Sequence, residues 1–392
     1  MTRKKKVFIG TLTTAAVVGL VACCMYVLTR DRVSVVRPFD DVRFKNLRSL
    51  DLSSRPGLPD TLWFNETTVW PKASRMPSGR SPQTILSEGM NPGLGVRELH
   101  RQGVTGKGVN VAIIDLPMYA DHPEFAGKVI AYHDLGCGSQ ESSMHGSSVT
   151  SLLIGANCGS APDARVYYAA TPGGSLDAMY DAKALDWVVE QNSRLPTGDK
   201  IRLVSVSAIP SGLGAMRTKN TKMWDEACAR AEAAGIMVLD GTRTSRGFVG
   251  PCWYDPNDPE NVSKCTPGYW GPPTMASEWR ERSRLSECIL APCAPRTMAE
   301  EYNKGEFSYH YCGTGGLSLS IPYCAGVLAM GWQVNSHLTP GDIKSFLFKS
   351  AYLRPDGARI IDPKEFIRTV IEYHNTEESL RLPGGRAGSH DR

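Results

Sequence analysis

The hydrophobic positions of this chain form two kinds of pattern between residues 96 and 375. Short runs rich in β-branched residues, such as "VNVAIID" and "IRLVSVS", are typical of strands buried on both faces. Between them, segments such as "SLDAMYDAKALDWVVEQN" repeat apolar residues at helical spacing. Alternating strands and helices predict an α/β fold, a parallel β-sheet flanked by helices. The predicted strands cover 109–115, 164–170, 201–207, 236–240 and 287–293, and the predicted helices cover 175–192, 221–235, 339–351 and 362–374.

The beginning of the chain has a different pattern. The run from Val7 to Leu28 contains no charged residue. At about 1.5 Å per helical residue it is long enough to cross a hydrocarbon core of about 30 Å. Basic residues in 1–6 should stay in the cytoplasm, so we predict a transmembrane signal-anchor over 7–28 with the rest of the chain outside the cytoplasm. A cleaved signal peptide and a lipoprotein signal, in which "LVAC" ends at a lipidated Cys23, are the alternatives.

Three further segments complete the predicted organisation. Residues 29–95 lack periodicity and contain many turn formers, which indicates a juxtamembrane segment that wraps the surface. Residues 96–375 form the folded domain. Residues 376–392 are predicted to be a disordered tail.

Composition narrows the class of protein. The chain has 392 residues, of which 41% are hydrophobic and 21% charged, and the net charge is only +4, so nucleic-acid binding has no compositional support. Nine of the eleven cysteines follow residue 100, and outside the cytoplasm some of them would be able to form disulfides. No cysteine pair has the spacing of a zinc site with partner histidines, and we predict neither a metal nor a cofactor.

Three polar residues stand where chemistry is expected. Asp115 ends a predicted buried strand, and ligands gather at the carboxyl ends of strands in open α/β sheets. His145 opens the predicted helix of "MHGSSVTSLLIG", and Ser318 lies between a glycine turn and an apolar helix in "GTGGLSLSIPYCAG". A serine there lies near unpaired N–H groups and the positive end of the helix dipole. Taken singly, each residue also has a purely structural interpretation. Asp115 would cap the loop after its strand, His145 would be a solvated loop histidine, and Ser318 would be a helix N-cap.

Together these stretches resemble the subtilisin-like serine peptidases over residues 96–375. "TGKGVNVAIID…DHPEFAGKV" is similar to that family's Asp block, "HGSSVTSLLIG" to its His block HGTHVAG, and "GLSLSIPYCAG" to its Ser block GTSMASPHVAG. The resemblance implies a three-layer sandwich and a serine endopeptidase with Ser318 as nucleophile, His145 as general base and Asp115 orienting the imidazole. Ser320 is the rival nucleophile, and Pro322 is expected in the first helical turn, where a missing N–H costs little.

The resemblance also implies how a substrate would bind. A peptide would add as a strand along 205–214, where Ser207, Ala208 and Gly212 are the expected contacts, so the implied partner is a peptide or protein substrate. The family supplies an oxyanion-hole asparagine that this chain lacks. An ungapped alignment places Thr244 there, and a shift would bring Thr242 or a protonated Asp240.

Two other departures from the family pattern are visible. Leu116 and Pro117 follow Asp115 where the family has Thr/Ser-Gly, and Ser148 replaces the second histidine of the His block. These departures leave a second hypothesis open, a catalytically impaired pseudo-peptidase that binds peptides or partner proteins at the membrane. The chain lacks the HExxH motif of metallopeptidases, and "GLSLS" does not match the GxSxG of lipases.

Overall fold

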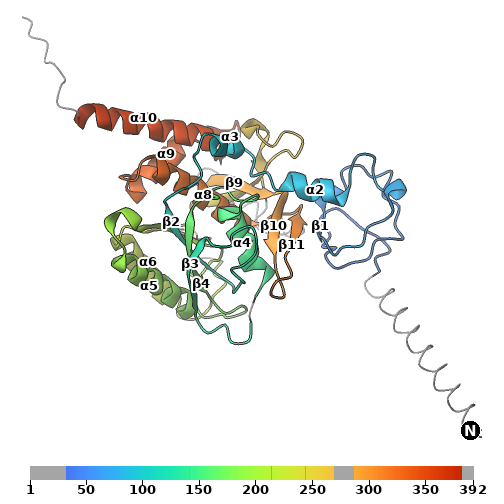
Figure 1. Cartoon of the computed structure of the whole chain (residues 1–392), viewed down its shortest axis with the longest axis horizontal. Coiled ribbons are helices and arrows are strands. Elements are labelled where there is room, and N and C mark those ends of the chain that lie inside the picture. Colours follow the sequence, from blue (N-terminus) through green and yellow to red (C-terminus); the bar gives the residue numbers. More distant parts are fainter. Residues whose placement is uncertain (1–31, 141, 213, 243, 269–286, 382–392) are drawn as a thin grey trace, which may run out of the picture.

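A five-stranded parallel sheet forms the centre of the molecule (Figure 1). The structure is a computed structural model that describes residues 32–140, 142–212, 214–242, 244–268 and 287–381. In spatial order the strands are β3 (Val129–Asp134), β4 (Arg165–Ala170), β2 (Asn110–Asp115), β5 (Ile201–Val206) and β6 (Met237–Leu239). All four strand pairs are parallel, as the alternation of strands and helices predicts.

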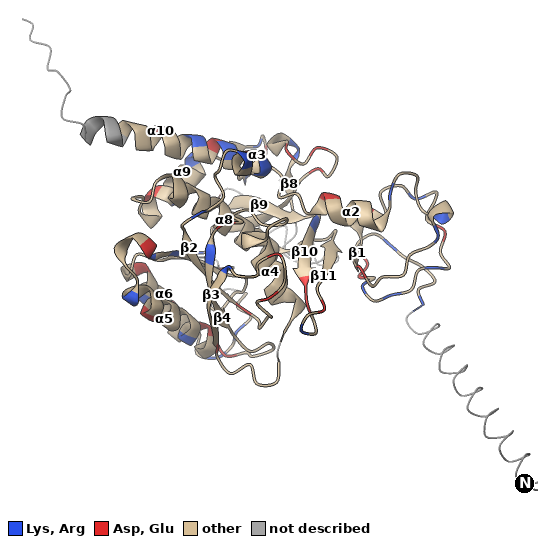
Figure 2. Ribbon diagram, viewed as in Figure 1, with Lys and Arg blue, Asp and Glu red and all other residues tan. Residues whose placement is uncertain are grey.

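Alternate residues of β2 face two different hydrophobic cores. Val111 and Ile113 belong to the core that contains helices α4 (Met144–Ile154) and α8 (Leu317–Val334). Ala112 and Ile114 belong to the core under α5 (Met179–Arg194) and α6 (Thr221–Ala233). Helices therefore cover both faces of the sheet, and the predicted three-layer α/β architecture is confirmed. Figure 2 shows charged residues on the outer helices α5 and α6, whereas the buried helix α8 carries none.

The order of the strands places a binding crevice at β2. After β2 the chain builds β3 and β4 on one side of it and then crosses to β5 on the other side. Such a reversal of direction is the topological switch point at which open α/β sheets bind ligands, outside the carboxyl ends of the strands. Asp115 is the last residue of β2 and so lies at this point.

Two smaller sheets extend the domain, and they contain most of the strands that the sequence pattern missed. A mixed sheet packs beside α8, and an antiparallel sheet packs against α4. The first consists of β12 (Tyr352–Leu353), β13 (Arg359–Ile360), β9 (Ile289–Ala294), β7 (Val249–Trp253) and β8 (Thr266–Pro267), in that order. The second consists of β1 (Trp63–Asn65), β11 (Ser308–Cys312) and β10 (Arg296–Glu300).

The segment before the domain, predicted to wrap the surface, is folded and has regular elements of its own. Its buried side chains, among them Leu47, Leu62 and Phe64, form a hydrophobic cluster that also includes Tyr311 of β11. In Figure 1 this segment is the blue lobe at one side, joined to the domain through β1 and α2. Its regular elements are β1, the short 3-10 helices Pro59–Thr61 and Ala73–Arg75, and α2 (Pro82–Gly89).

The remaining elements lie around this framework. Helices α9 (Pro340–Ser350) and α10 (Pro363–Arg381) pack with α8 at the C-terminal end, as predicted, and α10 continues past residue 376, where we expected a disordered tail. Helix α3 (Val96–Arg101) contacts α10, and the other short 3-10 helices are Thr197–Asp199 and Val262–Lys264.

Two predictions concern membranes and disulfides. The predicted signal-anchor over 7–28 lies outside the described residues. In the described part of the chain, α8 is long and apolar enough to cross a membrane, but 83% of its apolar window is buried inside the protein, as in a core helix. The cysteines from Cys137 to Cys324 are all buried thiols in the structure, so it contains no disulfide among these nine residues.

Candidate active site

Asp115 and His145 meet at the carboxyl end of β2. Asp115 Oδ1 lies 2.6 Å from His145 Nδ1. The histidine stands in the first turn of α4, whose N-cap Ser143 accepts a hydrogen bond from Gly146 N at 3.3 Å. The Asp115 side chain is 4% exposed and the His145 side chain 32% exposed, so the imidazole reaches solvent while its partner does not. An ionised carboxylate only accepts hydrogen bonds, so Nδ1 carries the proton and Nε2 keeps a free lone pair.

The surroundings of His145 raise its pKa. Burial by itself lowers the pKa of an imidazole, because it disfavours the charged form. The charge of Asp115 and the hydrogen bond to it act in the opposite direction and prevail, so the pKa of His145 lies above its ordinary value.

Glycine at position 146 permits this contact. A β-carbon on Gly146 would clash with the carbonyl oxygen of Leu116 and lie 2.6 Å from Tyr168 Oη. The Tyr168 hydroxyl donates to the same Leu116 oxygen, and Ser143 N donates to Pro117 O at 2.7 Å. The first turn of α4 is therefore held directly against the loop that follows Asp115.

Ser318 stands at the start of α8, next to Ser207, the residue that follows β5. The turn before the helix uses Gly315 with φ of 75°, a backbone conformation that favours glycine. Ser318 is the second helical residue, so its N–H is among those that have no partner within the helix. Its hydroxyl donates to Ser207 O at 3.2 Å and not to His145, so the structure brings Asp115 and His145 together and leaves Ser318 outside that contact.

Ser320 is placed differently from Ser318. Its side chain is completely buried, and its hydroxyl donates to Ala291 O of β9 at 2.8 Å. The Ser318 residue, in contrast, is only partly buried. Ser320 therefore fastens α8 to the neighbouring sheet, and burial separates it from a substrate.

Pro322 lies inside α8, and the expectation of a first-turn position is wrong. Because α8 begins at Leu317, an N–H at 322 would normally donate to the carbonyl of Ser318. Proline has no N–H, which leaves this acceptor without a helical partner. Ser207 Oγ donates to Ser318 O at 2.9 Å instead. Two reciprocal hydrogen bonds thus join Ser207 to Ser318.

The residues expected at the oxyanion hole form a hydroxyl chain that ends on Asp240. The Asp240 carboxylate accepts hydrogen bonds from Trp224 Nε1 at 2.9 Å, from Thr242 N at 2.9 Å and from Thr242 Oγ1 at 2.5 Å. Thr242 and Thr244 share a hydrogen bond of 2.7 Å, and Thr244 is its donor because the single Thr242 proton goes to Asp240. Asp240 is therefore the acceptor in all three of these contacts, and the Thr244 proton is directed toward Thr242.

The segment expected to bind substrate follows β5. The Ala208 carbonyl accepts from Gly241 N at 2.7 Å, which ties this segment to the facing loop. Gly212 is exposed with φ of 77°, and its carbonyl accepts from Ala215 N at 3.1 Å in a turn. Ser207 forms two hydrogen bonds with Ser318, so one of the three residues expected to bind substrate contacts the candidate nucleophile.

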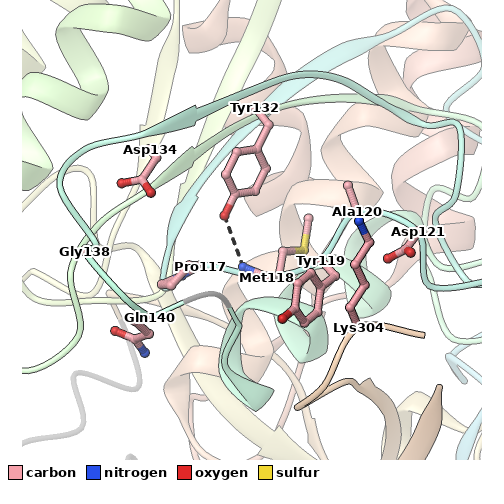
Figure 3. Close-up of a pocket in the computed structure, with 10 residues that line it drawn as sticks. All are labelled: Pro117, Met118, Tyr119, Ala120, Asp121, Tyr132, Asp134, Gly138, Gln140 and Lys304. Atoms are coloured by element: carbon pink, nitrogen blue, oxygen red, sulfur yellow. Dashed lines mark hydrogen bonds between the residues drawn. The ribbon is translucent and has the colours of Figure 1, made fainter. Parts of the chain in front are cut away.

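A cavity of about 530 Å³ opens beside the loop that follows Asp115 (Figure 3). The Tyr132 hydroxyl accepts a hydrogen bond from Met118 N at 3.2 Å and stands over it. Asp134 accepts from the N–H groups of Gly136 and Cys137, which lowers its pKa and keeps it ionised. The cavity is large enough for a side chain of a bound peptide. It is lined by Pro117, Met118, Tyr119, Ala120, Asp121, Tyr132, Asp134, Gly138, Gln140 and Lys304.

A second histidine stands behind α4, and sequence reasoning missed it. His310 Nε2 lies 2.8 Å from Ser148 Oγ, so a histidine from β11 contacts the position at which the family motif has its own second histidine. Its other nitrogen, Nδ1, accepts from Trp63 Nε1 at 2.7 Å. No local motif in "SYHYC" marks His310, and only the alternation of a short strand would have suggested that it faces inward.

Comparisons with known proteins found relatives of this chain, although no protein family model matches it. Serine protease AprX of Bacillus subtilis (strain 168) is 23% identical over 282 residues, which are 64% of this chain and 63% of AprX. The subtilisin-like protease PopC of Myxococcus xanthus (strain DK1622) is 26% identical over 148 residues, which are 33% of this chain and 31% of PopC. The chain thus spans less than two thirds of either relative.

Solved structures resemble the chain over most of its length. The subtilase cytotoxin SubAB aligns with a TM-score of 0.55 and 14% identity over 74% of this chain and 98% of that one. Fervidolysin from Fervidobacterium pennivorans, a keratinolytic enzyme related to subtilisin, aligns with a TM-score of 0.51 and 16% identity over 71% of this chain and 45% of that one. The fold is therefore the subtilase-like α/β fold. Together with the sequence relatives, it supports the subtilisin-like serine protease family for this chain.

The close approach at Gly146 gives a first prediction. In Gly146→Ala the added methyl group must push α4 away from Leu116, which separates His145 from Asp115. Because a misplacement of about 1 Å can cost about 10²-fold in rate, we expect kcat/KM toward a peptide substrate to fall by that order. Gly341→Ala is the control, since Gly341 also lies in the first turn of a helix, α9, and a β-carbon there would make only an ordinary contact of 3.7 Å with Thr339 Oγ1. Equal activity in the two variants would contradict the role assigned to Gly146.

The link between Ser207 and Ser318 gives a second prediction. Ser207→Ala leaves the Ser318 carbonyl without a donor, and we expect a loss of about 1–3 kcal/mol in the free energy of unfolding. In Pro322→Ala the new backbone N–H is able to donate to the same carbonyl. Ser207→Ala should therefore cost less in the Pro322→Ala background, and chemical denaturation of the four proteins measures this coupling. Additive effects would show that the two side chains do not share this acceptor.

Proposed function

We propose that the protein is a serine endopeptidase that cleaves peptide bonds through an acyl-enzyme. The observation that carries this proposal is the 2.6 Å contact between Asp115 and His145 at the switch point of a subtilase-like sheet. Ser318 is the second residue of α8 and lies beside Ser207 after the neighbouring strand β5, and its partly buried hydroxyl donates to a single carbonyl oxygen. Sequence relatives that are serine proteases support the same class of activity.

In the proposed mechanism, the Ser318 hydroxyl leaves Ser207 O and turns to His145 Nε2. The imidazole accepts the proton as Ser318 Oγ bonds to the scissile carbonyl carbon, and Asp115 stabilises the imidazolium. The tetrahedral oxyanion lies near the first N–H groups of α8, where the helix dipole favours negative charge. His145 then returns the proton to the leaving amine, the C–N bond breaks, and water hydrolyses the acyl-enzyme by the reverse sequence of proton transfers.

The proposed substrate is an extended peptide or protein segment. It would lie along residues 205–214, with its backbone beside Ser207 and Ala208 and the turn at Gly212 bounding the groove. The cavity beside Pro117 would receive one of its side chains (Figure 3). We also propose that residues 7–28 anchor the enzyme in a membrane with the active site outside the cytoplasm.

One observation favours a second candidate function, a peptide-binding pseudo-peptidase. The Ser318 hydroxyl is hydrogen-bonded to Ser207 O, and the Thr244 proton is directed toward Thr242 rather than into the crevice. A protein fixed in this arrangement would bind an extended peptide without attacking it. The retained Asp115–His145 contact favours the enzyme, because peptide binding by itself does not require a paired imidazole.

Covalent labelling distinguishes the two functions. A fluorophosphonate probe should label the full-length protein at Ser318, and Ser318→Ala should abolish the labelling, because the probe reacts only with an activated serine. Ser320→Ala is the matched control, since the Ser320 hydroxyl is buried against Ala291, and this variant should still be labelled. Absence of labelling in the parent protein would support the pseudo-peptidase, and labelling that survives Ser318→Ala would place the nucleophile elsewhere.

The raised pKa of His145 predicts the pH dependence of the activity. The neutral imidazole is the base, so kcat/KM should rise with pH through the pKa of His145, which lies above the ordinary value of about 6.5. Asp115→Asn removes the carboxylate charge and should move this acid limb to lower pH. It should also reduce the maximal rate, by an amount on the order of 10⁴. A pH profile that is the same in both proteins would exclude His145 as the base paired with Asp115.

A further inference from the structure

Three hydrogen bonds connect the N-terminal segment to the helix that carries His145. Trp63 Nε1 lies 2.7 Å from His310 Nδ1, and His310 Nε2 lies 2.8 Å from Ser148 Oγ. Ser148 Oγ in turn lies 2.7 Å from the carbonyl oxygen of Met144. Met144 is the first residue of α4 and directly precedes His145. The chain of bonds therefore begins on β1 and ends on the backbone next to the candidate base.

The chemistry of the donors fixes the direction of every bond in this chain. An indole N–H only donates, so His310 Nδ1 is an acceptor and the proton of the neutral ring is on Nε2. Burial, the charge of Arg43 and the proximity of His145 lower the pKa of His310 to about 3, so the ring is neutral at working pH. His310 Nε2 then donates to Ser148, whose own proton goes to Met144 O as the nearest acceptor. Removal of the indole N–H leaves His310 Nδ1 without its donor. The ring proton is then no longer restricted to Nε2, and the orientation of the imidazole is no longer fixed.

The position of Trp63 is itself fixed by its backbone pairing and by a contact to its ring. Its backbone belongs to β1, which pairs antiparallel with β11 so that Trp63 lies opposite Cys312 and Asn65 lies opposite His310. Arg43, paired with Asp41, lies over the indole ring at 3.7 Å from its centroid. Ala299 of β10, the strand on the other side of β11, contacts the same helix. Its N–H donates to Ser151 Oγ of α4 at 3.0 Å, about one turn after Ser148.

We infer that Trp63, a residue of the N-terminal segment, is a positioning residue for His145 and acts through His310 and Ser148. This inference rests on the proposed function of His145 as the base. The N-terminal segment is then a working part of the active site rather than a spacer between membrane and enzyme. Ser148 stands where the family motif has its second histidine, and here the histidine that contacts this position comes from β11.

A second tryptophan in the same segment provides a matched control. Trp70 packs against Phe64 with ring centroids 4.9 Å apart, and both tryptophans are partly buried. Within the described residues, the buried Trp70 Nε1 has no hydrogen-bond partner. Replacing either tryptophan by phenylalanine keeps an aromatic ring and removes one N–H. The two variants therefore differ in whether the lost N–H belonged to the chain that reaches α4.

The experiment compares Trp63→Phe and Trp70→Phe in the full-length protein with two readouts. The first is the rate of labelling by the fluorophosphonate probe, which we expect to fall about tenfold to 10²-fold in Trp63→Phe and to stay unchanged in Trp70→Phe. The second is long-range ¹H–¹⁵N NMR of ¹⁵N-histidine protein, in which His310→Gln and His145→Gln assign the two rings. In Trp63→Phe we expect His310 to lose its pure Nε2–H tautomer and the titration midpoint of His145 to move down toward its ordinary value.

The outcomes separate this inference from the proposed function. Ser148→Ala should reproduce the loss, and adding it to Trp63→Phe should cause little further change, because both act through one chain. If the parent protein is not labelled but Trp63→Phe still shifts the His145 titration, the positioning role stands and the peptidase proposal fails. If Trp63→Phe leaves the labelling rate and the His145 titration as they are in the parent, the positioning role is overturned. Equal losses in both tryptophan variants would also overturn it, since they would indicate a general loss of packing.

Discussion

The close contact between the first turn of α4 and the loop after β2 is the constraint on which the rest of the site depends. A histidine and an aspartate share a proton usefully only when their side chains lie within hydrogen-bond distance, and here the separation is 2.6 Å. That distance depends on how closely the backbone of α4 approaches the backbone of the loop after β2, and not on the two side chains alone. Position 146 has no room for a side chain, and the carbonyl of Leu116 occupies the space. Glycine at position 146 is therefore required for α4 to pack against Leu116, and this packing keeps His145 within hydrogen-bond distance of Asp115.

The helix of the candidate nucleophile shows a second way in which packing and chemistry are coupled. Proline inside α8 removes one helical hydrogen bond, and the freed carbonyl belongs to Ser318 itself. Ser207 fills the gap and also accepts the Ser318 proton, so one residue after β5 restrains both the backbone and the side chain of the candidate nucleophile. An unpaired buried carbonyl would cost about 1–3 kcal/mol, which explains why such a gap is filled. Two hydrogen bonds to Ser207 therefore restrain the start of α8.

Two buried polar side chains around the site, Asp240 and His310, follow the same rule. Asp240 satisfies its carboxylate with an indole N–H, a backbone N–H and a threonine hydroxyl, and this directs the neighbouring threonine proton inward. His310 satisfies both of its ring nitrogens with one indole and one hydroxyl. In each case a tryptophan from another element supplies a donor. At Ser148 and at Thr242, where the chain departs from the family pattern, the side chains are therefore part of local hydrogen-bond networks.

The sequence by itself determined the class of fold and pointed to three polar residues, of which the structure joins Asp115 and His145. Buried parallel strands and amphipathic helices leave periodic patterns within a few residues, and the Asp, His and Ser stretches combine glycine, small residues and a candidate catalytic side chain in one short window. Tertiary structure decided the rest. The folded N-terminal lobe, the burial of Ser320, the interior position of Pro322 and the bond from Trp63 to His310 depend on contacts between distant segments, 247 positions apart in the last case. Periodicity is a property of neighbouring residues, whereas a hydrogen-bond partner is chosen by whatever the fold brings within 3 Å, and only the packed chain makes that choice.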